Sequence, residues 1–267
     1  FEYWFGPYPF YEDSYKIVES PHLGMEHQSN VAYGNNYGNG YLGRDLSGTG
    51  VGLKWDYIII HESGHEWFAN NITAKDQADM WIHESFTMYS EPLFVEKYMD
   101  KDSADKYIQG VRQMIANDKP IIGMYGIRNE GSGDMYPKGA NMIHTIRQVI
   151  NNDEKFRQIL RGLNKDFYHQ TVTTKEVEDY FIQKSGIDLK SIFDQYLRTV
   201  KIPTLVYKQN GNQLTYKWTN VVPDFKLPIR LADEQELKPT EQWQTTTLKS
   251  DKPVEFNKNY YVVYSKQ

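Results

Sequence analysis

The chain has 267 residues, with 30 Lys and Arg against 35 Asp and Glu, and therefore a formal net charge of −5. This length allows one large domain, or one domain with a small companion, and it is enough to bury an ordinary hydrophobic core. Because nucleic acids and anionic membrane surfaces attract cationic proteins, the acidic balance argues against both as the main partner. The absence of cysteine excludes thiolate nucleophiles, cysteine zinc sites and disulfides.

The chain begins with Phe1 instead of an initiator methionine, so we expect it to be a fragment or a processed form. Its longest aliphatic run is the three isoleucines at 58–60, far short of the roughly 20 apolar residues that span a bilayer. We therefore expect no transmembrane segment. The stretch from Phe1 to about Gly52 combines aromatic residues and prolines with many glycines, a pattern typical of irregular, β-rich structure.

From Trp55 to Thr199 apolar residues recur with helical spacing. Residues 138–150 place aliphatic side chains on one helix face. Pro137 suits the first position of that helix, which puts Tyr136 at its N-terminal end.

A second helix is marked by its ends. Thr173 and Glu176 have the spacing of a capping box ahead of an apolar run, and Gly186 is suited to end the helix. After Pro203 the pattern changes to the alternation of β-strands. Apolar residues alternate with polar ones on both sides of the turn sequence Asn-Gly-Asn at 210–212, which predicts a hairpin. Further short strands are expected at 227–231, 245–248 and 260–264.

The most informative stretch is His61-Glu62-Ser63-Gly64-His65. On a helix, residues i and i+4 are about 40° apart in rotation and about 6 Å apart in rise. Both imidazoles therefore face the same side and can bind one metal ion. Glu62 lies about 100° round from His61, beside the metal, where it can deprotonate a bound water. A catalytic zinc site needs a third protein ligand and one open position.

The third ligand has two candidates in a segment expected to form a second, antiparallel helix. Glu84 is separated from His65 by 18 residues, and a carboxylate with two histidines is a known hydrolytic zinc set. His83 is its neighbour, turned about 100° away on the helix. We favour Glu84, partly on the resemblance described next. Glu91 lies within about 20° of the same helix face and either accepts the outer N–H of a ligand histidine or is a solvated residue.

These residues resemble the gluzincin zinc aminopeptidases of the aminopeptidase N and leukotriene hydrolase type, whose signature is H-E-x-x-H, eighteen residues and then E. Other segments are similar in the same order: Pro21–His27 to the G-x-M-E-N strand, Trp67–Asn70 to W-F-G-N, Trp81–Phe86 to W-L-N-E-G-F, and Tyr136–Ala140 to Y-x-K-G-A. The resemblance runs from about Pro21 to Leu197.

The resemblance implies an α+β fold. We expect a thermolysin-like, mostly α catalytic domain at 1–202, with an N-terminal β region and a truncated start, followed by a small β-sandwich at 203–267. Members of the family normally carry a further β-sandwich domain upstream. We expect that domain to be missing from this chain and to pack on the N-terminal region.

The resemblance also implies the chemistry. One zinc ion would be held by His61, His65 and Glu84. Glu62 would be the general base for the attacking water and then the proton donor to the leaving amine. Tyr136 would donate its hydroxyl to the tetrahedral oxyanion.

Three further residues would bind the substrate. Glu26 would bind the free α-ammonium of a peptide, and Gly24 and Met25 would align the peptide backbone as an added strand. The resemblance thus implies a zinc-dependent aminopeptidase that hydrolyses the N-terminal residue from peptides with a free N-terminus. The alternative is a catalytically silent peptide-binding or scaffold module of the same fold. His27 and Ser85 depart from the family pattern, which bears on side-chain preference more than on chemistry.

Overall fold

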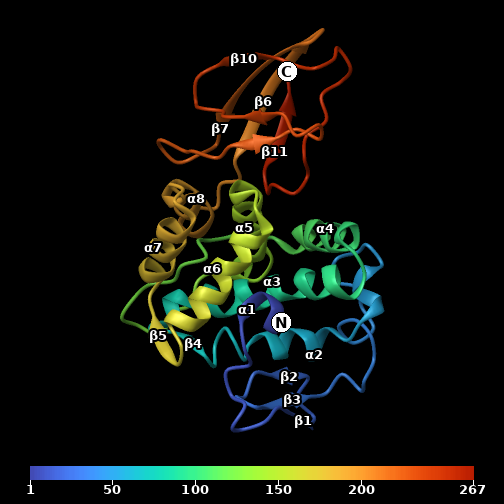
Figure 1. Ribbon diagram of the computed structural model, residues 1–267, viewed down its shortest axis with the longest axis vertical. Coiled ribbons are helices and arrows are strands. Elements are labelled where there is room, and N and C mark those ends of the chain that lie inside the picture. Colours follow the sequence, from blue (N-terminus) through green and yellow to red (C-terminus); the bar gives the residue numbers. More distant parts are fainter.

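The structure, a computed structural model, describes residues 1–267. Helices fill the middle of the molecule, a small sheet built from N-terminal residues lies at one end, and the C-terminal strands lie at the other (Figure 1). This mixture of α and β structure confirms the expected class at a coarse level. The finer expectations, a thermolysin-like layout and a division between residues 202 and 203, stay predictions.

The helices are α1 (Glu2–Phe5), α2 (Tyr57–Gly64), α3 (Trp81–Tyr98), α4 (Lys101–Gly110), α5 (Pro137–Ile150), α6 (Asp153–Asp166), α7 (Thr174–Ser185) and α8 (Lys190–Arg198). Short 3-10 helices are η1 (Val51–Lys54), η2 (Gln77–Asp79), η3 (Val111–Met114) and η4 (Gly133–Met135). The strands are β1 (Lys16–Glu19), β2 (Gly24–Met25), β3 (Asn30–Tyr33), β4 (Ile72–Ala74), β5 (Gln170–Val172), β6 (Thr204–Asn210), β7 (Gln213–Thr219), β8 (Ile229–Arg230), β9 (Glu236–Leu237), β10 (Gln244–Thr247) and β11 (Val263–Lys266). No helix combines the length and the apolar character that crossing a membrane requires.

The N-terminal region contains the expected β structure. Its three strands have the order β1-β3-β2, with β1 parallel and β2 antiparallel to β3. Strand β2 is therefore an edge strand with one unpaired side. The short helix α1 was not expected from the sequence. Its Trp4 and Phe5 side chains are buried, and Phe5 packs edge to face on Phe68, so aromatic packing holds this turn in place.

Helices α2 and α3 pack closely, which matters for the site they carry. Helix α2 starts after Asp56, whose carboxylate accepts hydrogen bonds from the backbone N–H groups of Ile58 and Ile59. Near its end, a Cβ atom on Gly64 would lie 2.6 Å from Oγ of Ser90 on α3. Only a residue without a side chain lets the two helices approach this closely.

The helix ends predicted from the sequence are confirmed. Pro137 is the first residue of α5 and Tyr136 is its N-cap. The capping box of Thr173 and Glu176 forms at the start of α7, and Gly186 ends that helix with a φ of 68°. These local signals act within one helical turn, so they do not depend on how the helices pack.

The C-terminal strands form a four-stranded sheet of order β10-β7-β6-β11 and a separate β8-β9 pair. The predicted hairpin is confirmed as β6 and β7, and a β-sandwich stays a prediction. The last strand begins at Val263, later than the expected start at residue 260. The reason is that Tyr260 and Tyr261 are buried, and the Tyr261 N–H donates to Oγ1 of Thr145 on α5.

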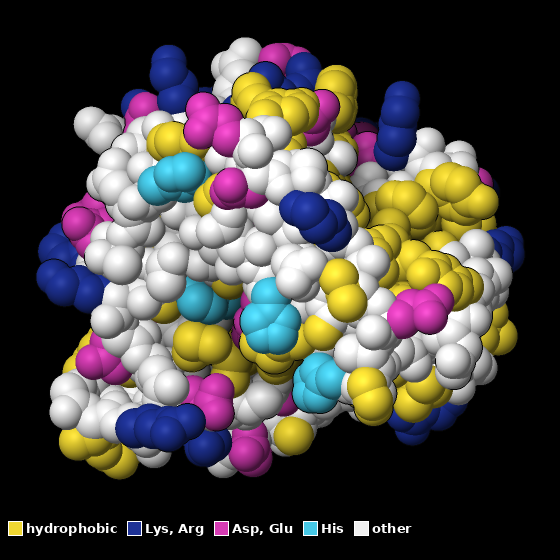
Figure 2. All heavy atoms as spheres, turned by 90° about the horizontal axis from the view of Figure 1, so that it is seen from below, with side chains coloured by type: hydrophobic (Ala, Val, Ile, Leu, Met, Phe, Trp, Pro, Cys, Tyr) yellow, Lys and Arg dark blue, Asp and Glu magenta, His cyan; other side chains and the backbone are white.

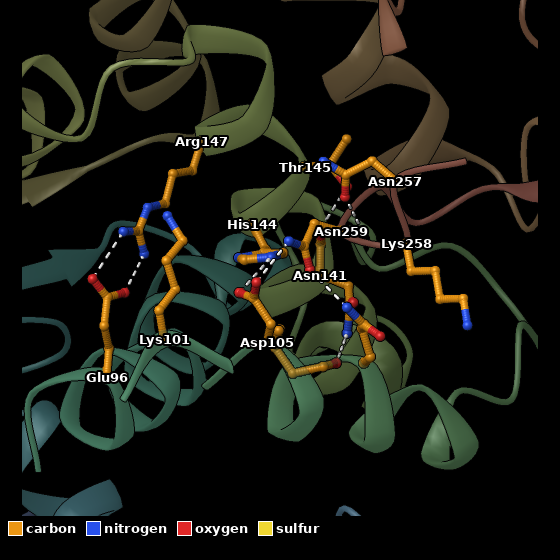
Figure 3. A network of polar contacts seen from close by, with 12 residues as sticks. Glu96, Lys101, Asp105, Asn141, His144, Thr145, Arg147, Asn257, Lys258 and Asn259 are labelled. Atoms are coloured by element: carbon orange, nitrogen blue, oxygen red, sulfur yellow. Dashed lines mark hydrogen bonds and ion pairs between the residues drawn. The ribbon is translucent and has the colours of Figure 1, made fainter. Parts of the chain in front are cut away.

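A network of polar contacts joins the C-terminal segment before strand β11 to the helices (Figure 3). The Asn259 side chain donates to Oδ2 of Asp105 at 2.8 Å and accepts from Nε2 of Gln109 at 2.7 Å, so it bridges two residues of α4. His144 of α5, drawn in the same figure, is buried, and its Nδ1 is 3.1 Å from the Tyr89 hydroxyl. The hydrophobic core also continues from the helices into the tail.

This buried histidine predicts a pH dependence of folding. Burial, together with the charges of Arg147 and Arg112, lowers the pKa of His144 to about 3. The unfolded chain therefore binds one more proton than the folded chain below about pH 6.5. The contribution of His144 to the free energy of unfolding is therefore fully present above that pH. It decreases toward pH 3, by up to about 1.4 kcal/mol per pH unit. Urea unfolding in the presence of a chelator should show that the free energy of unfolding decreases more steeply with falling pH in wild type than in His144→Gln. Equal pH slopes in the two proteins would contradict this expectation.

Candidate active site

The two histidines of the H-E-x-x-H segment lie one turn apart on α2, and Glu84 lies opposite them on α3. All three side chains are buried. Oε2 of Glu84 is 3.7 Å from Nε2 of His61 and 3.5 Å from Nε2 of His65. The three side chains form a group whose donor atoms could hold one metal ion.

The outer nitrogen of each histidine is held by an acceptor. Nδ1 of His61 is 2.8 Å from Oε1 of Glu91, and Nδ1 of His65 is 3.0 Å from the carbonyl oxygen of Phe68. Because carboxylate and carbonyl oxygens only accept, each Nδ1 carries a proton, and Nε2, which faces Glu84, is the nitrogen left to bind a metal. This is the tautomer that a metal-binding histidine needs, and such outer contacts are typical of metal sites.

The oxygen between the two imidazoles supports the metal reading. Oε2 of Glu84 is buried and has no hydrogen-bond partner. In a tetrahedral zinc site with bonds of about 2.1 Å, neighbouring ligand atoms lie about 3.4 Å apart, close to the separations seen here. The residues therefore fit a zinc ion. Without an ion, burial alone would lower the pKa of His61, but its contacts with Glu84 and Glu91 raise it to about 10, so a metal ion that binds Nε2 displaces a proton from it.

The competing ligand His83 points elsewhere. Its Nε2 accepts a hydrogen bond from the backbone N–H of Ala74 at 2.7 Å, which occupies the lone pair that a metal would need. Burial lowers the pKa of His83 to about 4, consistent with a neutral acceptor. His83 thus attaches α3 to strand β4.

Glu62 faces the N-terminal sheet. A Cβ atom on Gly24 would lie 2.5 Å from Oε1 of Glu62, so the backbone of β2 lies directly against this carboxylate. Glu26 follows β2, and its carboxylate reaches within 4.8 Å of donor atoms of Glu62 and His65. Met25, which lies between Gly24 and Glu26 in the chain, is exposed at the sheet edge. Burial raises the pKa of Glu62, although the two imidazoles beside it oppose this.

The face formed by the N-terminal sheet is seen in Figure 2, which views the molecule from below Figure 1. Histidine and acidic side chains lie near one another toward the middle of this face, and the lysine and arginine side chains are scattered. The exposed histidines from this region are His22 and His27.

Tyr136 joins the group from a third element. It precedes α5, and its ring stacks on that of His61 with 6.0 Å between centroids and 23° between planes. Burial, followed by the charge of Glu84, raises the pKa of Tyr136 well above its ordinary value. The phenol therefore remains a hydrogen-bond donor at neutral pH.

Comparisons with known proteins identify the family. Residues 3–196 match the peptidase family M1 domain. The chain belongs to this family. Aminopeptidase N of Lactococcus lactis subsp. lactis is 24% identical over 224 residues, which cover 73% of this chain and 26% of that protein. Alanine/arginine aminopeptidase of Saccharomyces cerevisiae is 22% identical over 169 residues, which cover 59% of this chain and 20% of that protein.

A solved structure shares the fold of this M1 chain. It is an M1 zinc metallopeptidase mutant from Deinococcus radiodurans bound to a Tyr-Ser-Ala substrate, with a TM-score of 0.60 and 20% identity. The match covers 76% of this chain and 43% of that one. The chain thus spans about a quarter of the length of the curated relatives and under half of the solved structure. The gluzincin family predicted from the sequence is confirmed.

Some residues around the site were not found from the sequence. The Thr87 hydroxyl lies 3.1 Å from Nδ1 of His65, and the Tyr107 hydroxyl donates to Glu91. Thr87 is three residues after Glu84, so helical spacing was an available signal. Tyr107 lies on α4 and is one of 21 tyrosines, and no spacing relates it to the site.

The geometry of the M1 chain predicts how the metal is bound. Wild type should bind one zinc ion per chain, and His65→Ala should lose most of it because two ligands rarely hold zinc in a catalytic site. His83→Gln is the matched control, since its amide oxygen can still accept from Ala74. Metal analysis after dialysis checks both variants. Equal zinc loss in the two variants, or no zinc in wild type, would contradict the assignment.

Proposed function

We propose that the chain carries the catalytic site of a zinc-dependent aminopeptidase that hydrolyses the N-terminal residue of peptides. The observation that carries the proposal is the buried, unpaired oxygen of Glu84 between the Nε2 atoms of His61 and His65. The carboxylate of Glu62 and the unpaired edge of strand β2 lie beside this group. Membership of family M1, and similarity to aminopeptidases, support the same reading.

In this proposal His61, His65 and Glu84 hold one zinc ion. When bound, the ion would polarise the scissile carbonyl and lower the pKa of a water molecule, so that the water can be deprotonated and attack the carbonyl as a nucleophile. Glu62 accepts a proton from that water as the water oxygen bonds to the carbonyl carbon. Glu62 then delivers the proton to the leaving nitrogen as the C–N bond breaks, which regenerates the carboxylate. The buried position of Glu62, which raises its pKa, suits a group that must both take and return a proton.

Tyr136 stabilises the negative charge that develops on the carbonyl oxygen. Its hydroxyl is held by the stacking of the ring on His61 and by its place at the start of α5. The N-terminal end of a helix carries partial positive charge, which favours an oxyanion at the same place.

Substrate binding in this proposal uses the unpaired edge of β2. A peptide that runs along Gly24 and Met25 adds a strand to the sheet and passes directly beside Glu62. Glu26 pairs with the α-ammonium of the substrate at the end of that strand. A peptide without a free N-terminus leaves Glu26 unpaired, which is why the site would act on N-terminal residues.

The proposal includes the finer architecture expected from the family. The helical part would be a thermolysin-like catalytic domain, and the strands from β6 to β11 would form a small β-sandwich. The packing of a further domain on the N-terminal region stays a prediction. The second reading, a silent peptide-binding module, differs from the proposal in turnover alone.

The role of Glu62 as the general base is tested with a substitution that leaves the three metal ligands unchanged. Glu62→Ala should keep its zinc and lose about 10²–10⁴-fold in turnover of an aminoacyl anilide. Glu66→Gln is the control on the next turn, because Glu66 contacts the backbone N–H of Ser29 and not the metal group. Normal turnover in Glu62→Ala would exclude this base. Zinc-loaded wild type that binds peptide without cleaving it, also in the full-length parent, would favour the silent module.

Recognition of the N-terminus is tested with paired substrates. Wild type should cleave peptides with a free amine far better than the same peptides N-acetylated. Glu26→Gln should raise KM for the free peptides and reduce this discrimination, because the charge that pairs with the ammonium is gone. Measuring kcat and KM on both substrates checks the expectation. Unchanged discrimination in Glu26→Gln would assign amine recognition to another residue.

A further inference from the structure

A buried carboxylate links the metal group to a helix that contributes no ligand. Glu91 is completely buried, seven residues beyond Glu84 on α3. Its Oε1 faces Nδ1 of His61 at 2.8 Å, and its Oε2 accepts from the Tyr107 hydroxyl of α4 at 2.6 Å. Tyr107 is itself buried, with its ring edge to face on Trp55. The hydroxyl of Tyr107 thus lies two hydrogen bonds from a ligand of the proposed metal.

The two oxygens of Glu91 have separate partners, and this determines where the carboxylate points. With Tyr107 on Oε2, the other oxygen is left for His61, whose ring is then fixed with Nε2 toward Glu84. If the phenol hydroxyl is removed, Oε2 becomes a buried charged oxygen without a donor. The carboxylate then gains by turning toward any other donor, at the cost of its contact with His61.

Helix α4 is held in place from its opposite side by the turn that precedes strand β11. Asp105 and Gln109 are four residues apart and share one face of α4, whereas Tyr107 lies about 200° round from Asp105. Asn259 bridges Asp105 and Gln109 through its two side-chain atoms. Figure 3 shows Asn259 reaching from the C-terminal segment to Asp105. The helix is therefore fixed between Asn259 on one side and the Tyr107–Glu91 contact on the other.

We propose that Tyr107 is a positioning residue for the metal site, acting through Glu91 on His61, and that Asn259 keeps α4 where Tyr107 can reach Glu91. The C-terminal segment that contains Asn259 thereby contributes to metal retention although it supplies no ligand. This inference rests on the proposed zinc function and adds to it a path of contacts from residue 259 to residue 61. Under this inference the Tyr107 hydroxyl, which lies outside the sequence motifs of the site, affects metal affinity as well as folding.

The hydroxyl is tested with Tyr107→Phe, which keeps the ring. Tyr89→Phe is the matched control, because Tyr89 is equally buried and its hydroxyl contacts His144 instead of the metal group. Competition with a chromophoric chelator should show about tenfold weaker zinc binding in Tyr107→Phe and no change in Tyr89→Phe. The visible spectrum of Co²⁺ bound in place of zinc should shift in the same variant alone, since it reports ligand geometry.

Thermal unfolding of the metal-free proteins separates positioning from a structural role. If both variants lose stability and neither loses zinc affinity, the hydroxyl of Tyr107 is structural and the inference is wrong. Equal weakening of zinc binding in both variants contradicts it as well. Weaker binding and a shifted Co²⁺ spectrum in Tyr107→Phe alone support it.

The contribution of the tail is tested with Asn259→Ala. Its zinc affinity should fall, by less than in Tyr107→Phe, because α4 is loosened and the hydroxyl remains. Gln209→Ala is the control, since Gln209 makes its contacts within the C-terminal strands. Equal effects of these two variants would overturn the part played by Asn259. Zinc binding by wild type separates this inference from the proposed function, because a wild type that binds no zinc would refute the proposed function itself.

Discussion

The site depends on one carboxylate oxygen, Oε2 of Glu84, that is buried between the Nε2 atoms of two histidines. This oxygen has no hydrogen bond, and it lies 3.7 Å from Nε2 of His61 and 3.5 Å from Nε2 of His65. Buried charges are costly unless they are paired. A divalent cation bound at this point would coordinate the carboxylate and both Nε2 atoms at once, which is the arrangement that the proposed zinc site requires.

The rest of the fold brings chemistry to that point. The close approach of α2 and α3 at Gly64 sets the distance between the ligands, and the start of α5 brings Tyr136 onto His61. The edge strand β2 places its backbone against Glu62. The C-terminal strands lie at the far end of the molecule (Figure 1), and Asn259 and Tyr261, which precede strand β11, contact α4 and α5.

The sequence predicted those features that depend on local spacing. The angle between His61 and His65 follows from helix geometry, and the ends of α5 and α7 follow from residues within one turn. The third ligand needed the resemblance, because two helices must pack before Glu84 can meet the histidines. Tyr107 escaped prediction because its contact with Glu91 joins two helices and has no periodic signature. The late start of β11 has a similar cause, since Tyr260 and Tyr261 are buried as a result of tertiary packing.

The most direct test of the central claim is a crystal structure of the chain grown with zinc, with diffraction data collected on both sides of the zinc absorption edge. The account predicts one anomalous peak per chain, within bonding distance of His61, His65 and Glu84. A peak on His83 or on surface carboxylates, or an ordered chain with no peak among the three residues at saturating zinc, would contradict it.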